Sequence, residues 1–143
     1  MIRKVAAYSN ALMMLTSIHH IYGAWVYHTP WRLHVLALSI PVLIVNWFLV
    51  RGAVSRFKFY MFCLVNFVIS VILIGLYEGM FNHLMKNLLY FSGLDKDTLL
   101  KMFPPPTYVM PNDFWFELTG VTQALITVPL IYFSIKLVKA GAK

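Results

Sequence analysis

The sequence has few charged residues. Only 12% of its 143 residues are charged, about half the fraction found in an ordinary soluble domain. Hydrophobic residues make up 60% of the chain, aromatic residues 16%, and the mean hydropathy is +0.72. So little charge cannot cover the water-facing surface of a soluble domain, and the composition therefore indicates a protein that lies in a lipid bilayer.

Charge is absent altogether from four long runs. Residues 5–31, 33–50, 59–77 and 118–135 contain no Asp, Glu, Lys or Arg, which gives runs of 27, 18, 19 and 18 residues. As a helix, each run spans about 30 Å of hydrocarbon at ~1.5 Å per residue. We therefore predict an all-α integral membrane four-helix bundle that forms a single domain over 1–143. The expected helices lie at about 5–28, 31–50, 55–80 (with an extension toward 91) and 114–138. No length remains for a soluble catalytic, nucleotide-binding or nucleic-acid-binding fold.

Acidic residues are scarce, and their placement predicts the orientation of the chain. Eight cations flank the expected helices on one side: Arg3, Lys4, Arg51, Arg56, Lys58, Lys136, Lys139 and Lys143. The other side carries four cations and all five acidic residues. Because cytoplasmic loops are enriched in Lys and Arg, both termini are expected in the cytoplasm. The compact chain favours a prokaryotic inner membrane, and its basic excess is a topology signal rather than a sign of nucleic-acid binding.

Cysteine is nearly absent as well. Cys63 is the only one, so no internal disulfide can form. The first apolar run is long, and no A-x-A-like cleavage site follows it before His28. This run is therefore expected to be a retained helix rather than a signal peptide.

One long outer loop is expected between the third and fourth helices, over 92–113. It contains a predicted short helix over 97–102 with Asp97 as its N-cap, followed by three consecutive prolines that force an extended segment. Asn112 or Asp113 is expected to cap the last helix.

Polar side chains gather in the outer half of the expected bundle. All five histidines lie there together with Glu78 and Glu117. On the first helix, small and polar residues share one face that should turn toward other helices: Ser9, Thr16, His20, Gly23 and Tyr27. His20 is the inward candidate on this face. His19 lies ~100° away, so the two histidines are not expected to face one ligand.

The two glutamates are expected at the same depth, because the third and fourth helices run antiparallel. We predict a pocket lined by His20, His34, Glu78 and Glu117. Two carboxylates close together in a low dielectric supply a proton donor beside an acceptor, so Glu78, Glu117 and His20 are the catalytic candidates. The ligand-binding candidates are His34, Asn82, Tyr27 and Asp97.

A metal or haem site is an open alternative, and the sequence does not specify a cofactor. No Glu-x-x-His motif of the di-iron bundles is present, and Glu78 and His83, five residues apart, are expected to diverge on a helix. A metal in this pocket would have His20, His34, Glu78 and Glu117 as ligands. A haem would lie between His20 and either His34 or His83.

Short motifs in the second half of the chain resemble a known family. The Lys96-Asp97-Thr98-Leu99-Leu100 turn is followed by three prolines, by Phe116-Glu117, and by Gln123 and Pro129. This order is similar to that in the emopamil-binding and sterol-isomerase (EXPERA) membrane superfamily, with the two halves in swapped order, and Leu76-Tyr77-Glu78 with His83 resembles its acid-and-histidine helix. The resemblance implies a helical membrane protein that binds sterols or related lipophilic amines. It also implies Glu78, Asp97 and Glu117 as ligand contacts.

From the residues, we expect the pocket to bind a lipophilic small molecule and to act on it by acid/base chemistry. The alternative from another class is an accessory subunit of a larger membrane complex, or a homo-oligomer, that packs through its small-residue faces. Membrane lipids are expected partners, and nucleic acid is not.

Overall fold

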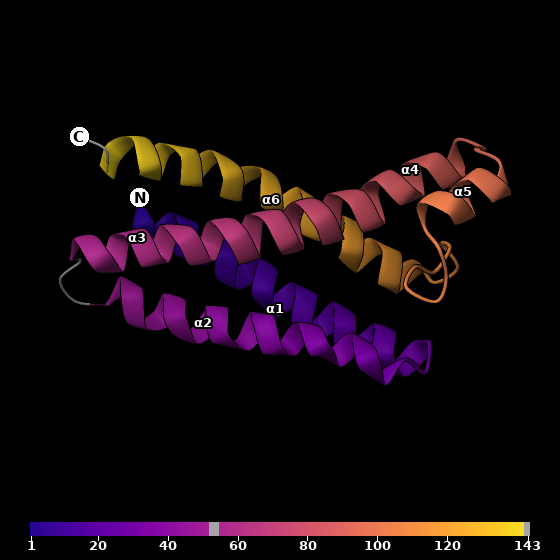
Figure 1. Ribbon diagram of the computed structural model, residues 1–143, viewed down its shortest axis with the longest axis horizontal. Helices are drawn as coiled ribbons and strands as arrows, with labels where there is room; N and C mark the ends of the chain where they lie inside the picture. The colour runs from indigo at the N-terminus through magenta and orange to yellow at the C-terminus, as the bar shows by residue number, and fades with distance from the viewer. Residues whose placement is uncertain (52–54, 142–143) are drawn as a thin grey trace.

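The computed structural model describes residues 1–51 and 55–141, and these residues form helices and connecting turns with no β-strand. The elements in chain order are α1 (Ile2–Val26), η1 (Pro30–Val35), α2 (Leu36–Val50), α3 (Arg56–Val65), η2 (Asn66–Met85), α4 (Lys86–Phe91), α5 (Lys96–Met102) and α6 (Phe114–Gly141). The all-α prediction is confirmed for this part of the chain (Figure 1).

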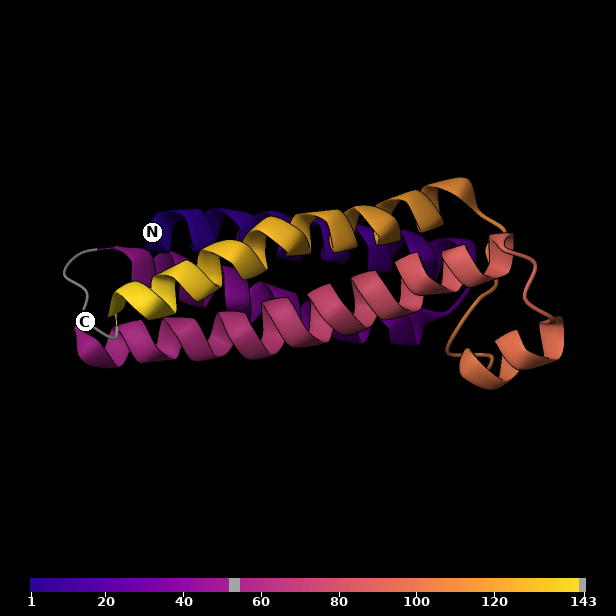
Figure 2. The ribbon, with the colours of Figure 1, turned by 90° about the horizontal axis from the view of Figure 1, so that it is seen from above.

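The long helices run side by side along the longest axis of the molecule. In Figures 1 and 2, α3, η2 and α4 form one continuous rod, which confirms the expected extension of the third helix toward residue 91. The two marked termini lie at the same end, and α5 lies at the opposite end. The η2 segment has the wider i→i+5 hydrogen-bond pattern of a π-helix, which the sequence did not predict.

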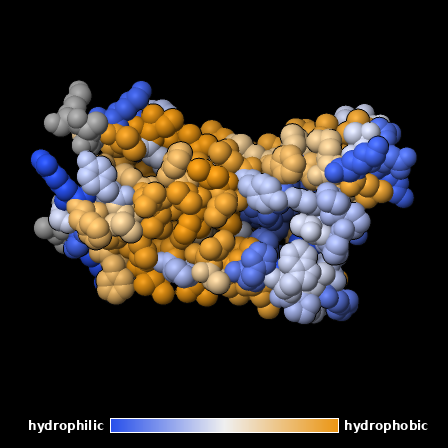
Figure 3. Space-filling model, in the orientation of Figure 1, coloured by the Kyte–Doolittle hydropathy of each residue, from blue (hydrophilic) through white to orange (hydrophobic). Residues whose placement is uncertain are grey.

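Three helices are long and apolar enough to cross a membrane: Pro30–Val50, Arg56–Phe91 and Phe114–Ala140. The first helix, α1, is long enough at 25 residues but is not among them, because it carries two histidines, two serines, an asparagine and a threonine. Figure 3 shows an apolar surface over the left and middle of the molecule. Hydrophilic residues gather at both ends and around a hollow on the right.

Small residues let η2 and α6 approach each other closely. A Cβ atom added to Gly79 would lie 2.8 Å from the backbone nitrogen of Ala124, and one added to Gly75 would meet the side chain of Thr127. A third glycine, Gly120 of α6, faces the ring of His83. These contacts fix the depth at which the polar residues of the two helices meet.

The helix ends follow ordinary capping chemistry, with one correction. The hydroxyl of Ser55 accepts from Lys58 N at 3.3 Å, and the carboxylate of Asp113 accepts from Phe116 N at 2.7 Å, as expected for a cap of the last helix. The short helix begins at Lys96 rather than Asp97, and its cap is Asp95, which accepts from Thr98 N at 2.9 Å. The prediction of Asp97 as the cap was wrong, because only the residue just before the first turn can reach the third amide.

A cluster of hydrogen-bonded amides and hydroxyls joins the helices in the half of the molecule that contains the termini. The amide of Asn46 on α2 donates to Ser9 at 3.0 Å and to Asn10 at 2.9 Å, and it exchanges hydrogen bonds with Asn66. Ser9 in turn bonds Ser70 at 2.8 Å. Interhelical hydrogen bonds of this kind commonly stabilise the packing of membrane helices. Because these amides and hydroxyls satisfy one another, we assign them a structural role.

Candidate functional site

Three imidazoles converge on one carboxylate in the other half of the molecule. The Nε2 atoms of His20, His83 and His19 lie 3.3, 3.5 and 3.8 Å from Oε1 of Glu78. The two histidines on α1 and His83 on η2 are buried, with at most 4% of their surface exposed. The second carboxylate oxygen of Glu78 accepts from the amide of Asn82 at 2.7 Å.

His19 and His20 both face Glu78, which corrects the expectation that they could not share one partner. Their rings pack edge to face with centroids 5.2 Å apart. The Cα–Cβ directions of successive helical residues differ by ~100°, but an imidazole places Nε2 far from the helix axis. A carboxylate that lies between the directions of the two side chains is therefore within reach of both Nε2 atoms.

His83 also faces Glu78, although residues five apart were expected to diverge. That expectation assumed a regular α-helix, in which i and i+5 point in different directions. The η2 segment closes its turns between i and i+5, which brings these two positions toward one side. The segment keeps Asn82 beside Glu78 as well, so one turn supplies the carboxylate and two of its neighbours.

The hydrogen bonds around Thr119 favour one tautomer of His19. The hydroxyl of Thr119 donates to the carbonyls of Trp115 at 2.8 Å and Phe116 at 3.0 Å. Its oxygen therefore accepts from Nδ1–H of His19, at 2.9 Å. A neutral His19 then points the bare lone pair of Nε2 at the carboxylate of Glu78. Two acceptors that face each other require a proton or a metal cation between them.

His83 is held in the same way from its other side. Its Nδ1 lies 3.0 Å from Oε2 of Glu117, and a carboxylate at that distance accepts the Nδ1–H. Oε1 of Glu117 pairs with Nζ of Lys86 at 2.9 Å, and Oε2 also accepts from the amide of Asn87. Lys86 is 2% exposed and Glu117 is 8% exposed. Glu117 is thus the centre of a buried network, and it reaches Glu78 only through His83.

Several ring nitrogens of this cluster have no hydrogen-bond partner in the described part of the chain. These are Nε2 of His19 and both ring nitrogens of His20. The carbonyl oxygen of Asn82 and the amide of Gln123 on α6 are also buried and unpaired among these residues. Buried polar groups are rarely left unpaired, so water or a bound ligand is expected beside these atoms.

Aromatic side chains close the cluster. The ring of Phe116 stacks on His19 with centroids 4.1 Å apart and packs against His83 at 5.2 Å. Gly23 of α1 makes room for this ring, because a Cβ atom there would lie 2.5 Å from it. Phe116 therefore covers one side of the imidazoles and keeps water from it, which strengthens the electrostatic interactions among them.

The outer loop is tied to the helices beside the cluster. Lys86 donates to the carbonyl of Val109 at 2.6 Å, and the hydroxyls of Tyr77 and Tyr108 bond at 2.6 Å. Burial and the Tyr77 hydroxyl raise the pKa of Tyr108 to about 12, so the Tyr108 hydroxyl keeps its proton at physiological pH. A cavity of about 570 Å³ lies under the end of the loop, and its walls include Asn87 and Glu117.

The remaining predicted site residues lie outside the cluster. His34 is exposed, with Nδ1 2.6 Å from the carbonyl of Trp31, and its ring centre is 6.4 Å from that of His20. The hydroxyl of Tyr27 donates to Asn112 at 2.7 Å, which ties α1 to the loop. Asp97 is exposed on α5. His34 therefore lies beside His20 on the surface, held there by the short η1 helix, and not around Glu78, so its role in the predicted pocket of His20, His34, Glu78 and Glu117 stays a prediction.

Sequence reasoning missed four residues of the cluster. His19 was set aside on helical geometry, and His83 was set aside on its spacing from Glu78. Lys86 and Asn87 were taken only as part of the extension of the third helix toward residue 91. A lysine within the charge-poor extension of a membrane helix was the available signal, because an ionisable group at that depth needs a partner.

The arrangement fits a metal ion. Ligand atoms of His19, His20 and Glu78 all lie within 4.8 Å of one another. With metal–ligand bonds of ~2.0–2.1 Å, ligand atoms of a tetrahedral site are about 3.3 Å apart, which is near the separations of the imidazole nitrogens from Glu78. Ligating histidines usually donate their other N–H to a carboxylate or another acceptor, as His19 and His83 do here.

Comparison of the chain with protein-family models, with curated proteins and with solved structures finds no match. The resemblance to the sterol-isomerase superfamily therefore stays a prediction.

Proposed function

We propose that this protein binds one divalent transition-metal ion inside the membrane, through His19, His20 and Glu78. The observation that carries the proposal is the convergence of imidazole nitrogens on Oε1 of Glu78, with the Nδ1 atom of His19 already engaged by Thr119. Two histidines and one carboxylate are a common ligand set for Zn²⁺ and for Fe²⁺ with an open coordination position. His83 lies beside this set and is the candidate for a further ligand.

We propose that a lipophilic molecule in the outer half of the membrane binds at the open coordination position of the metal ion, as a ligand or a substrate. The apolar cover that Phe116 gives to His19 and His83 supports this class. Acid/base chemistry by Glu78, Glu117 and His20 without a metal is the rival expectation. Under that rival, the lone pair of His19 that faces Glu78 needs a proton instead of a metal ion.

The proposed setting is a four-helix bundle in a prokaryotic inner membrane. Three spans meet the length and hydropathy required, and α1 is proposed as the fourth because it packs along the other three with its polar side chains inward. Both termini are proposed to lie in the cytoplasm, on the basis of the eight cations at that end.

The test is metal content after controlled reloading. The full chain is purified in mild detergent, stripped with a chelator, reloaded with Zn²⁺ or Fe²⁺, washed and measured by elemental analysis. We expect about one ion per chain for the wild type, and little for Glu78→Gln or His20→Gln. His34→Gln is the matched control, because its ring lies 6.4 Å from His20 but on the surface, and it should retain the metal.

The proposal fails if the reloaded wild type holds no stoichiometric metal, or if His34→Gln loses as much as His20→Gln. A metal-free protein that carries a lipophilic molecule, and loses it in Glu78→Gln, would favour acid/base binding. An empty protein that co-purifies with a stoichiometric larger partner would favour the accessory subunit.

A further inference from the structure

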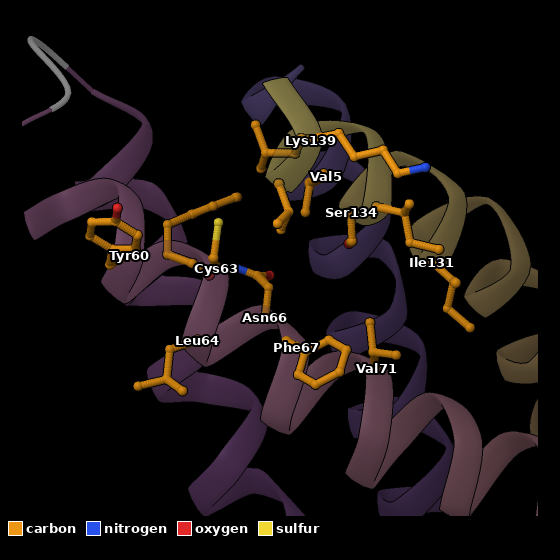
Figure 4. A pocket seen from close by; sticks show the side chains of 14 residues that line it. Val5, Tyr60, Cys63, Leu64, Asn66, Phe67, Val71, Ile131, Ser134 and Lys139 are labelled. Atoms are coloured by element: carbon orange, nitrogen blue, oxygen red, sulfur yellow. Dashed lines mark hydrogen bonds between the residues drawn. The ribbon is translucent and has the colours of Figure 1, made fainter. Parts of the chain in front are cut away.

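A groove of about 630 Å³ lies at the end of the molecule that contains the termini, far along the helices from the histidine cluster. Its walls are α3 with the start of η2 on one side and α6 on the other, and Val5 of α1 lies between them (Figure 4). The groove exists because η2 and α6 are held together at Gly75 and Gly79, whereas α3 and α6 separate toward the termini (Figure 1).

The polar side chains that line the groove are Tyr60, Asn66, Ser134 and Lys139, and the last two lie at different levels along α6. Lys139, near the end of α6, lines the groove with part of its side chain and is exposed, and in Figure 4 its ammonium extends away from the α3 wall. Ser134 lies five residues earlier on the same helix, about 7.5 Å deeper, and its hydroxyl oxygen is buried with no hydrogen-bond partner among the described residues. Farther from the end of α6, Ile131 and Val71 line the groove with hydrocarbon.

The charge of this end is of one sign. The sequence contains no acidic residue before Glu78 and none after Glu117, so the helix ends around the groove carry only cations. An exposed, flexible cation at the end of α6, an unpaired buried hydroxyl one to two turns deeper and an apolar floor match, in the same order, the phosphate, the ester carbonyl and the acyl chain of a phospholipid.

We propose that this groove binds an anionic diacyl phospholipid of the cytoplasmic leaflet. The phosphate pairs with the Lys139 ammonium, an ester carbonyl accepts from the hydroxyl of Ser134, and one acyl chain lies between α3 and α6. The inference uses the orientation given under the proposed function, and it is independent of the metal site.

The test measures lipid retained by the full chain. The protein is reconstituted in equal amounts of phosphatidylglycerol and phosphatidylcholine, re-extracted in mild detergent and examined by native mass spectrometry. We expect one retained phosphatidylglycerol per chain. Lys139→Gln should lower its retention about tenfold, the loss typical of one charge-assisted contact. Lys136→Gln, three residues away with its ammonium over the Tyr132 ring, is the matched control and should retain the lipid.

The single cysteine gives a second readout. Cys63 lines the groove and is the only thiol in the chain, so its alkylation by N-ethylmaleimide reports occupancy without any added label. Phosphatidylglycerol should slow this alkylation in the wild type and in Lys136→Gln, but not in Lys139→Gln. Metal content should be the same in all three proteins, which separates this test from that of the histidine cluster.

The proposal is overturned if the two lipids are retained equally, or if Lys136→Gln and Lys139→Gln release lipid to the same extent. A lipid-free dimer that protects Cys63 would assign the groove to a second copy. Because Lys139 is an exposed residue near the end of α6, loss of folding is not expected to obscure the comparison.

Discussion

At the scale of single residues, the histidine cluster is determined by what each ring nitrogen contacts. Thr119 directs His19 by accepting its Nδ1–H, and Glu117 does the same for His83. Both Nε2 atoms are thereby turned toward Glu78. These outer contacts are as informative as the convergence itself, because they favour the tautomers that a metal ligand requires.

Thr119→Val is expected to weaken metal binding about 10- to 100-fold, the usual effect of removing a contact that orients a ligating histidine. The change removes the acceptor of the His19 Nδ1–H and keeps the shape of the side chain. Thr122→Val is the control, since that hydroxyl bonds only the carbonyl of Leu118. Titration of the stripped proteins with Zn²⁺ measures both, and equal affinities would contradict the role given to Thr119.

The Glu117–Lys86 pair makes a separate prediction about stability. Glu117→Gln leaves the buried ammonium of Lys86 without its countercharge, and we expect a loss of about 3–5 kcal/mol in the free energy of unfolding. The double variant Glu117→Leu with Lys86→Met removes both charges and should recover most of that loss. Denaturant unfolding in detergent compares the three proteins. A double variant less stable than Glu117→Gln would contradict this explanation, because it would show that the ion pair itself contributes to the free energy of unfolding.

At the scale of elements, two features decide which residues meet. The i→i+5 turns of η2 bring Glu78 and His83 together, and the close contact of Gly79 with α6 brings Glu78 and Glu117 to neighbouring depths. The antiparallel pairing that places the glutamates near each other follows from helix order alone. The contact through His83 depends on the turn geometry, which the pattern of apolar residues does not encode.

The short helix α5 offers a test of its corrected cap. Asp95→Ala should speed hydrogen exchange at the amide of Thr98, because the carboxylate of Asp95 is its acceptor at 2.9 Å. Asp97→Ala is the control and should leave that amide protected. The amide hydrogen bonds lower the pKa of Asp95, so the charged cap is fully present above the usual aspartate range and is lost as the pH falls through the lowered value. Faster exchange in Asp97→Ala instead would restore the cap predicted from the sequence.

At the scale of the whole molecule, polar groups divide into two clusters with different chemistry. The cluster near the termini consists of amides and hydroxyls that satisfy one another, with Asn46 at its centre. The cluster at the other end contains the ionisable groups and most of the unpaired buried atoms. The functional site is therefore expected at the end with the histidine cluster, and the cluster near the termini is expected to stabilise helix packing.

The proposed orientation can be tested in a Cys63→Ala background. A cysteine at Ser92, in the turn after α4, should react with a membrane-impermeant maleimide in intact cells. A cysteine at Ser55, the cap of α3, should react only after the membrane is opened. Both positions are exposed in the structure, so the comparison reports sidedness rather than burial. Reaction at Ser55 in intact cells would place the termini outside.

The sequence by itself determined the helical class, three of the four predicted spans and the concentration of histidine and glutamate at one end. These follow from composition and from the length of charge-free runs, which depend only on local properties of the chain. Glu78, Glu117 and His20 were identified as candidate site residues in this way, because the sequence alone shows an ionisable residue within or beside an apolar run.

Only the tertiary structure decided how those residues combine. It joined His19 and His83 to Glu78, enclosed Lys86 and Glu117 as a pair, and left His34 on the surface. The physical reason is that the reach of an imidazole, the pitch of a turn and the approach of two helices at a glycine act over a few ångströms in three dimensions. The spacing of residues along the chain sets none of these distances.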